Sequence, residues 1–177
     1  MEHELIFRPG GMPPLFGDTA ATLIVDDDPA IAVLLCHILE PEGYHCTIAE
    51  NAAQARARVE ESDYALALVD VMMPGESGLE LAAELVRSHP DLAVVMVTGI
   101  DDSKIADLAI DTGAYGYVIK PFSVNHVLVI VANAGRRRCL EIERRVYERR
   151  LERRVDEQAA DLDEALIQLK ETTNPPD

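Results

Sequence analysis

The feature that most constrains the fold of this chain is a series of short apolar runs, each followed by a polar residue and then a segment with helical spacing. Short uninterrupted apolar runs are typical of parallel strands that are buried on both faces of a sheet. We expect five strands, at residues 22–25, 44–48, 65–69, 93–97 and 115–119.

Segments with helical spacing follow the strands. Asp28 and Pro29 form a cap and a first-turn proline ahead of an apolar-rich helical segment. The alternation of strand and helix predicts an α/β domain with right-handed crossovers and a doubly wound five-stranded parallel sheet. The expected helices lie at residues 31–39, 51–60, 78–88 and 102–111, and a last one begins after Ser123.

Polar residues end four of the five strands. Asp26 and Asp27 follow the first strand, Asp70 the third, Thr98 the fourth and Lys120 the fifth. The carboxyl ends of parallel strands meet at one edge of the sheet, where ligands bind in folds of this kind. Taken singly, each residue fits equally well as a turn, cap or strand-end residue. Taken together, they predict a site.

The chemistry available to these residues is phosphoryl transfer. Three carboxylates at one edge repel one another, and a bound Mg²⁺ with oxygen ligands relieves that repulsion. Asp70 can then act as a nucleophile on phosphorus, while the Lys120 ammonium and the Thr98 hydroxyl offset charge on the phosphoryl oxygens. The set therefore predicts an aspartyl phosphate.

Four motifs carry a family resemblance: LIVDDDP at 23–29, LVDVMMPGESG at 68–78, VVMVTG at 94–99 and GYVIKPF at 116–122. With these motifs, the chain resembles a receiver domain of a bacterial two-component response regulator over about residues 20–133. The resemblance implies a flavodoxin-like fold, a phosphorelay function, and a histidine kinase or phosphotransfer protein as partner.

The resemblance also implies a role for each site residue. The phosphoacceptor falls on Asp70. The Mg²⁺ ligands would be four oxygen donors: Asp26, Asp27, Asp70 and the backbone carbonyl of Met72. The family's hydroxyl, its lysine and the aromatic residue whose rotamer follows phosphorylation fall on Thr98, Lys120 and Tyr117. Ordinary packing remains an alternative role for Tyr117.

The chain departs from the family pattern at three positions. Ser77 stands where the family often has Asp, and we expect this change to affect a loop or cap rather than the chemistry. Met72 and Ile100 occupy positions that flank the route of the attacking water. Two apolar side chains there predict slow hydrolysis and a long-lived phosphorylated state.

Charge and composition restrict the class of partner. The net charge is −16, and residues 136–154 contribute +5, so the rest of the chain sums to −21 and should repel nucleic acid. No apolar run approaches the length of a membrane span, which predicts a soluble protein. Three scattered cysteines favour a reducing cytoplasm. Proline and glycine in residues 1–18 predict a disordered arm.

The helix that begins after Ser123 has no strong breaker before Pro175. We expect a receiver domain at 19–133, a coiled-coil helix at 134–170 and a disordered end at 171–177. An eleven-residue apolar spacing predicts a weakly or oppositely supercoiled helical pair, and hence a homodimer. The expected seam residues are Leu140, Leu151, Val155, Leu162, Leu166 and Leu169.

The arginine-rich segment 136–154 has glutamates interleaved at helical pairing distance, so exposed flanks of a coil explain it better than a nucleic-acid patch. The string RRRCLEIERRVYERRLERRVDEQAADLDEAL resembles the connector that joins receivers to phosphodiesterase outputs of the HD-GYP type. No output enzyme follows it in this sequence, so we expect a non-enzymatic phosphoacceptor with an unknown output partner.

Two alternatives to a phosphorylated receiver remain. One is a scaffold that the coil assembles without phosphorylation. The other is a phosphate-ester hydrolase of the haloacid-dehalogenase type, which also uses an aspartyl nucleophile with Mg²⁺. That class needs a DxD pattern followed by Thr or Val after the first strand, and Asp26-Asp27-Asp28-Pro29 lacks this ending.

Overall fold

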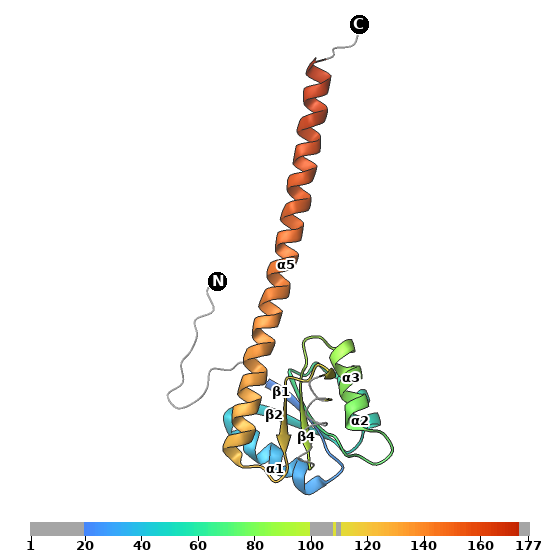
Figure 1. Cartoon of the computed structure of the whole chain (residues 1–177), viewed down its shortest axis with the longest axis vertical. Helices are drawn as coiled ribbons and strands as arrows, with labels where there is room; N and C mark the ends of the chain where they lie inside the picture. The colour runs from blue at the N-terminus through green and yellow to red at the C-terminus, as the bar shows by residue number, and fades with distance from the viewer. Residues whose placement is uncertain (1–19, 100–107, 109–110, 174–177) are drawn as a thin grey trace. The chain divides into compact units, whose positions relative to one another are not determined.

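The computed structural model describes residues 20–99, 108 and 111–173, with side chains to residue 169. A five-stranded sheet forms its centre, in the order β2-β1-β3-β4-β5 with every neighbouring pair parallel (Figure 1). The strands are β1 (Ala20–Val25), β2 (Tyr44–Ala49), β3 (Leu66–Asp70), β4 (Ala93–Thr98) and β5 (Gly116–Ile119). The predicted α/β class and doubly wound parallel sheet are confirmed.

The helices begin where the sequence places capping residues. Asp28, Asn51 and Ser77 each accept a hydrogen bond from a backbone N–H in the first turn of the helix that follows. The described helices are α1 (Pro29–Leu39), a 3₁₀ turn (Glu40–Glu42), α2 (Ala52–Glu61), α3 (Gly78–Ser88) and α5 (Val124–Thr173). The helix expected over 102–111 falls almost wholly outside the described residues.

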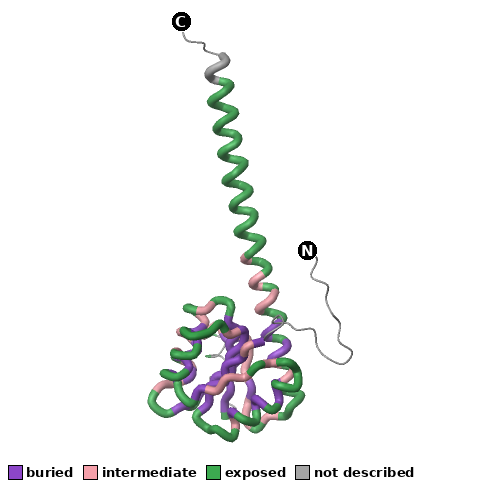
Figure 2. The backbone as a smooth tube through the Cα atoms, turned by 180° about the vertical axis from the view of Figure 1, so that it is seen from behind, coloured by how far each residue is buried: buried purple, intermediate pink, exposed green. Residues whose placement is uncertain are grey.

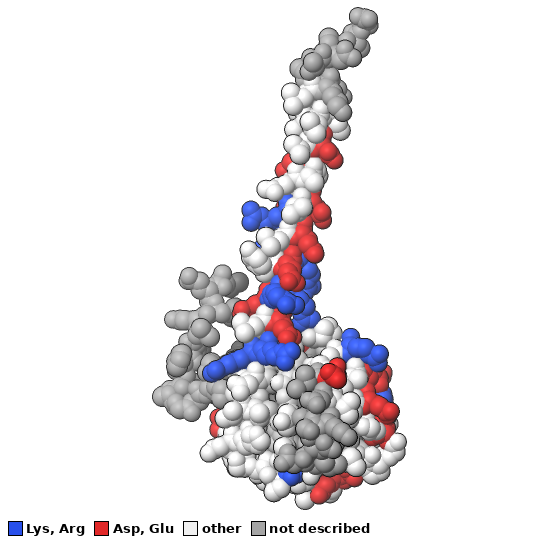
Figure 3. All heavy atoms as spheres, viewed as in Figure 1, with Lys and Arg blue, Asp and Glu red and all other residues white. Residues whose placement is uncertain are grey.

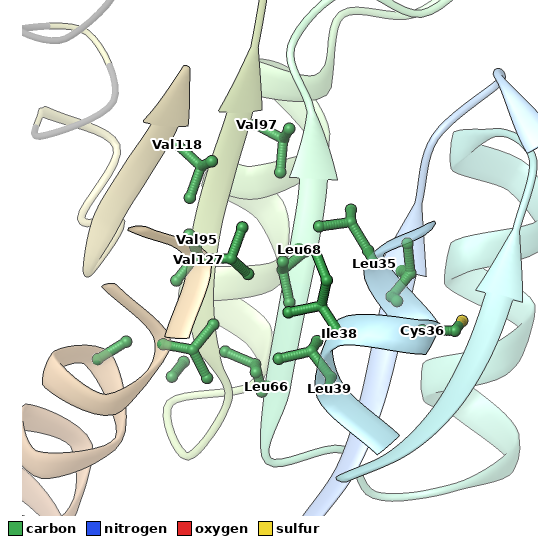
Figure 4. Close-up of a cluster of buried hydrophobic side chains, with 14 of the residues drawn as sticks. Leu35, Cys36, Ile38, Leu39, Leu66, Leu68, Val95, Val97, Val118 and Val127 are labelled. Carbon is green, nitrogen blue, oxygen red and sulfur yellow. The ribbon is translucent and has the colours of Figure 1, made fainter. Parts of the chain in front are cut away.

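Two hydrophobic clusters hold the helices against the sheet. On one face, Leu35 and Leu39 of α1 and Val127 of α5 pack with alternate residues of the central strands (Figure 4). On the other face, Ala55 of α2 and Leu81 of α3 pack with the intervening strand residues. This burial on both faces, shown in purple in Figure 2, accounts for the nearly continuous apolar character of β3 and β4.

Strand pairing extends beyond the apolar runs. β1 begins two residues before the expected start, because Ala20 and Ala21 pair with Tyr44 and His45 of β2. β3 extends one residue further than expected and ends on Asp70 itself. Ladder hydrogen bonds to the neighbouring strand set these limits, whereas hydropathy marks only the strand interior.

The chain divides into two compact units, one that ends at Cys139 and one that begins at Leu140. The first holds the sheet and the opening turns of α5. The second is the remainder of α5, and its described side chains from Val146 onward are all exposed. None of the described helices is both long and apolar enough to cross a bilayer.

Candidate functional site

The carboxyl ends of the central strands bring the predicted site residues to one edge of the sheet. Asp26 directly follows β1, Asp70 ends β3, and Thr98 ends β4. These three are among the few polar residues in the core, with exposed fractions of 1%, 4% and 1%. Buried polar groups are costly unless they are paired, so their retention at one edge indicates a functional cluster.

Lys120 bridges two of the buried carboxylates. It follows β5, and its ammonium Nζ donates to Asp26 Oδ2 at 2.7 Å and to Asp70 Oδ1 at 3.0 Å. The lysine side chain is only 20% exposed. One cation is thus held between two anions in a partly water-excluded edge, where charge interactions are stronger than at an open surface.

The carboxylate of Asp26 is held in place from two directions. While Oδ2 accepts from Lys120, Oδ1 accepts a hydrogen bond from the backbone N–H of Asp28 at 3.0 Å. Asp28 instead turns its own carboxylate to cap α1, accepting from Ala30 N at 2.9 Å. The two aspartates therefore differ in function: the Asp26 carboxylate binds Lys120, and the Asp28 carboxylate caps α1.

A third carboxylate leaves the cluster with excess negative charge. Asp26, Asp27 and Asp70 each offer an oxygen, and these three oxygens lie within 4.8 Å of one another. Asp27 is exposed while the other two are buried. Three carboxylates against one ammonium leave a net negative site of oxygen donors, which fits a hard divalent cation such as Mg²⁺.

Burial and neighbouring charges shift the two central ionisable groups. Burial raises the pKa of Asp70, and the negative charges of Asp26 and Asp27 add to the rise, while hydrogen bonding and attraction to Lys120 oppose it. Burial alone would lower the pKa of Lys120, but its hydrogen bonds to Asp26 and Asp70 outweigh that cost and raise it. Lys120 therefore remains an ammonium at neutral pH.

The loop after β3 approaches Asp70 closely. The backbone N–H of Gly78 donates to Val71 O at 3.1 Å, and a Cβ built on Gly78 would lie only 1.7 Å from Asp70 O. Only glycine fits at this position, which explains the glycine that ends the LVDVMMPGESG motif. The Met72 side chain in this loop is 60% exposed. Ile100, the second expected apolar flank, lies outside the described residues.

Thr98 and Tyr117 belong to the strands on the β5 side of the cluster. The Thr98 side chain is buried, and its backbone carbonyl accepts from the N–H of Lys120 at 2.6 Å. That bond ties the end of β4 to the residue that carries the ammonium. Tyr117 is half-buried and packs against the hydrophobic cluster beneath α2 and α3.

One ion-pair cluster, which involves the loop after β3, could not be predicted from the sequence. Arg56 of α2 forms a charge cluster with Glu84 of α3 and with Glu76, which lies in the loop after β3. Its Nη2 lies 2.6 Å from both carboxylates, and the pairing lowers the pKa of Glu76 and Glu84. These residues are 20 and 28 positions apart, so no local pattern could have joined them.

Comparisons with known proteins agree with this geometry. Residues 22–132 match the family described as the response regulator receiver domain. The chain is 39% identical over 114 residues to the nitrogen assimilation regulatory protein NtrX of Azorhizobium caulinodans, covering 63% of this chain and 25% of that protein. It is 31% identical over 133 residues to a cyclic di-GMP phosphodiesterase of Thermotoga maritima, covering 75% of this chain and 36% of the relative.

A solved structure shows the same fold. A CheY-like response regulator receiver domain from Methanospirillum hungatei superposes with a TM-score of 0.65 at 32% identity, over 70% of this chain and 98% of that one. The curated relatives are longer, and this chain spans 25% and 36% of the two proteins named above.

Proposed function

Because the chain belongs to the response regulator receiver domain family, we propose that it acts in a two-component phosphorelay by accepting a phosphoryl group on Asp70. The observation that carries this proposal is the Lys120 ammonium held between the buried carboxylates of Asp26 and Asp70. Receiver domains interact with histidine kinases or phosphotransfer proteins. A protein of that kind, in the cytoplasm, is the proposed phosphodonor.

In the proposed step, a carboxylate oxygen of Asp70 attacks phosphorus and forms an acyl phosphate, while the bond to the donor's leaving group breaks with its electron pair. Lys120 lies 3.0 Å from Asp70 Oδ1, where its positive charge offsets the charge on the incoming phosphoryl oxygens. Asp26 holds the other side of the ammonium and so keeps it oriented toward the reaction.

The acidic cluster supports a Mg²⁺ requirement, as in the family as a whole. Asp26, Asp27 and Asp70 would hold the ion with the backbone carbonyl of Met72. A carbonyl ligand explains why an apolar side chain is tolerated at position 72. When bound, Mg²⁺ would supply further positive charge for the phosphoryl oxygens.

We further propose that Thr98 and Tyr117 report phosphorylation. The Thr98 hydroxyl would donate to a phosphoryl oxygen, and the movement would allow Tyr117 to change rotamer. The affected surface would include β5, on which Tyr117 lies, and the start of α5, which packs on the opposite face of the same sheet. This is a population shift between two arrangements of the domain.

The proposed output is the C-terminal helix, which would pair with a second copy and pass the change on as altered helix pairing. The expected seam residues on it are exposed: Leu140, Leu151, Val155, Leu162, Leu166 and Leu169. The similarity to the Thermotoga maritima phosphodiesterase covers more of the chain than the receiver match does. A connector to an enzymatic output in a longer protein is a second proposed role for the same helix.

Retardation in a phosphate-binding Phos-tag gel tests the proposed function. The full chain is incubated with acetyl phosphate and Mg²⁺, and we expect a retarded band for the wild type and none for Asp70→Asn. Asp28→Asn is a matched control, because Asp28 caps α1 and asparagine caps equally well. Absence of the band in the wild type would favour the alternative of a phosphorylation-independent scaffold assembled by the exposed helix.

A further inference from the structure

The loop between β3 and α3 carries Met72, whose backbone carbonyl is a Mg²⁺ ligand in the proposed function. Hydrogen bonds of Val71 fix the point where this loop leaves the sheet. Its N–H donates to Val97 O at 2.8 Å, and its carbonyl accepts from the N–H of Gly78 at 3.1 Å. Among the described residues, no hydrogen bond holds the backbone of Met72 itself. The position of its carbonyl therefore depends on what restrains the rest of the loop.

Arg56 of α2 restrains the far side of this loop with its whole guanidinium group. Nη1 and Nη2 donate to the two carboxylate oxygens of Glu76, at 2.9 and 2.6 Å. Nε and Nη2 donate to the carboxylate of Glu84 on α3, at 2.6 to 3.1 Å. Paired bonds from a planar fork fix the direction of both carboxylates as well as their distance. One side chain therefore links α2, α3 and the loop.

The charges around Arg56 make this link hard to replace. Glu76 and Glu84 repel one another, and this repulsion raises the pKa of Glu84, against the larger lowering by Arg56 and a smaller lowering by Arg87. Figure 3 shows acidic side chains gathered at the surface over α2 and α3, with basic side chains beside them. Without the guanidinium group, two like charges would remain side by side. Their repulsion would drive the loop away from α3.

The restraint at Glu76 lies only four residues from Met72. Between them, the side chain of Met73 is buried in the hydrophobic cluster beneath α2 and α3. Gly75 has a φ of +89°, a left-handed conformation that glycine adopts without a steric penalty. The two residues are thus joined through an anchored side chain and a defined turn. A displacement of Glu76 would therefore reach the Met72 carbonyl.

From these contacts we propose that Arg56 is a positioning residue for the Mg²⁺ site. By holding Glu76 against α2 and α3, it fixes the loop that presents the Met72 carbonyl, and it touches neither the ion nor the phosphoryl group. The inference rests on the Mg²⁺ site of the proposed function and adds to it a residue of α2. An ion-pair network between partly exposed side chains contributes little to global stability, so its main effect is on the loop.

The sign of the change in Mg²⁺ affinity separates positioning from simple charge. Arg56→Met removes a positive charge, so by long-range attraction alone it would tighten Mg²⁺ binding. Positioning predicts the opposite. In calorimetric titration of the full chain with MgCl₂, we expect Arg56→Met to bind about tenfold more weakly, as for loss of a group that orients a metal ligand. Arg58→Met is the matched control, because it removes the same charge from the same helix and should bind no more weakly than the wild type.

Two further variants keep the net charge of the wild type. Arg56→Lys retains the charge but loses the bidentate fork, so it should also bind Mg²⁺ more weakly than the wild type. In the double variant Arg56→Met/Glu76→Gln, the two charge changes cancel, and charge alone predicts wild-type affinity. Positioning predicts that the double variant binds as weakly as Arg56→Met, because both changes remove the same link. Circular dichroism at the temperature of titration shows that each variant is folded.

The outcomes distinguish this inference from the proposed function. Wild-type or tighter Mg²⁺ binding by Arg56→Met and Arg56→Lys would overturn the positioning role, while phosphorylation of Asp70 would be unaffected. Wild-type affinity in the double variant would likewise overturn it and leave a charge effect in its place. Absence of Mg²⁺ binding by the wild type would overturn the metal site of the proposed function and this inference with it.

Discussion

Lys120 lies closer to Asp26 than to the proposed phosphoacceptor, with its Nζ 2.7 Å from Asp26 Oδ2 and 3.0 Å from Asp70 Oδ1. The ammonium is thus anchored by a carboxylate that does not itself react. A phosphoryl group on Asp70 would add negative charge on that side and draw the ammonium toward it. In the proposed mechanism, Lys120 would therefore respond to phosphorylation as well as assist it.

Removal of this ammonium should slow phosphorylation. Lys120→Met removes the positive charge that lies beside Asp70 and offsets the charge of the incoming phosphoryl oxygens, and we expect the rate with acetyl phosphate to fall by about 10²-fold, as for loss of one preorganised electrostatic contact. Arg58→Met is the control, because the ion pair of Arg58 among the described residues lies within α2, with Glu61 at 3.4 Å. An unchanged rate in Lys120→Met would contradict the role given to the lysine.

The Asp27 carboxylate should contribute to Mg²⁺ affinity and not to the stability of the fold. Its carboxylate is exposed and completes the acidic cluster, so Asp27→Asn should weaken Mg²⁺ binding by about tenfold or more. Isothermal titration calorimetry measures this directly. Asp28→Asn, which keeps the cap of α1, should bind Mg²⁺ like the wild type. Equal affinities of the Asp27 and Asp28 variants would exclude Asp27 from the metal site.

Gly78 should tolerate no side chain. A Cβ at this position would meet Asp70 O at 1.7 Å, so Gly78→Ala must displace the loop or the strand end. We expect the free energy of unfolding in urea to fall by about 2 kcal/mol or more. Gly99→Ala is the matched control, because a Cβ there meets nothing within 4 Å. A Gly78→Ala variant as stable as Gly99→Ala would show that the close contact between position 78 and Asp70 O does not require glycine.

Met72 should prolong the phosphorylated state. Its side chain is 60% exposed in the loop that follows Asp70, and a thioether can neither orient nor activate a water molecule. An amide at this position can, so Met72→Asn should lose its phosphoryl group several times faster than the wild type. Val33→Asn, at another exposed apolar position, should not change the rate. If Met72→Asn loses its phosphoryl group at the wild-type rate or more slowly, Met72 does not prolong the phosphorylated state.

The backbone of the domain was largely predictable because it depends on local chemistry. Short runs rich in apolar residues marked the five strands, and Asp28, Asn51 and Ser77 marked three helix starts by capping. The strand ends could not be placed to the residue, because pairing with neighbouring strands set them. Ala20 joins β1 through its partner Tyr44 and not through its own hydropathy.

The proximity of the acidic residues and Lys120 was predictable, but their detailed contacts were not. Strand order brings Asp26, Asp70 and Lys120 together. This could be predicted, because the carboxyl ends of parallel strands meet at one edge of the sheet. The stronger attachment of Lys120 to Asp26, and the Arg56 cluster that holds the loop after β3, depend on side-chain packing between distant segments. No spacing rule in the sequence reports such contacts.

Mass spectrometry can identify the residue that receives the phosphoryl group. Borohydride reduces an aspartyl phosphate to homoserine, so the full chain is treated with acetyl phosphate and Mg²⁺, reduced, digested and mapped by mass spectrometry. We predict homoserine at position 70 in the wild type, and at no position in a sample without phosphodonor. Homoserine at Asp26 or Asp27, or at no residue despite phosphodonor and Mg²⁺, would contradict it.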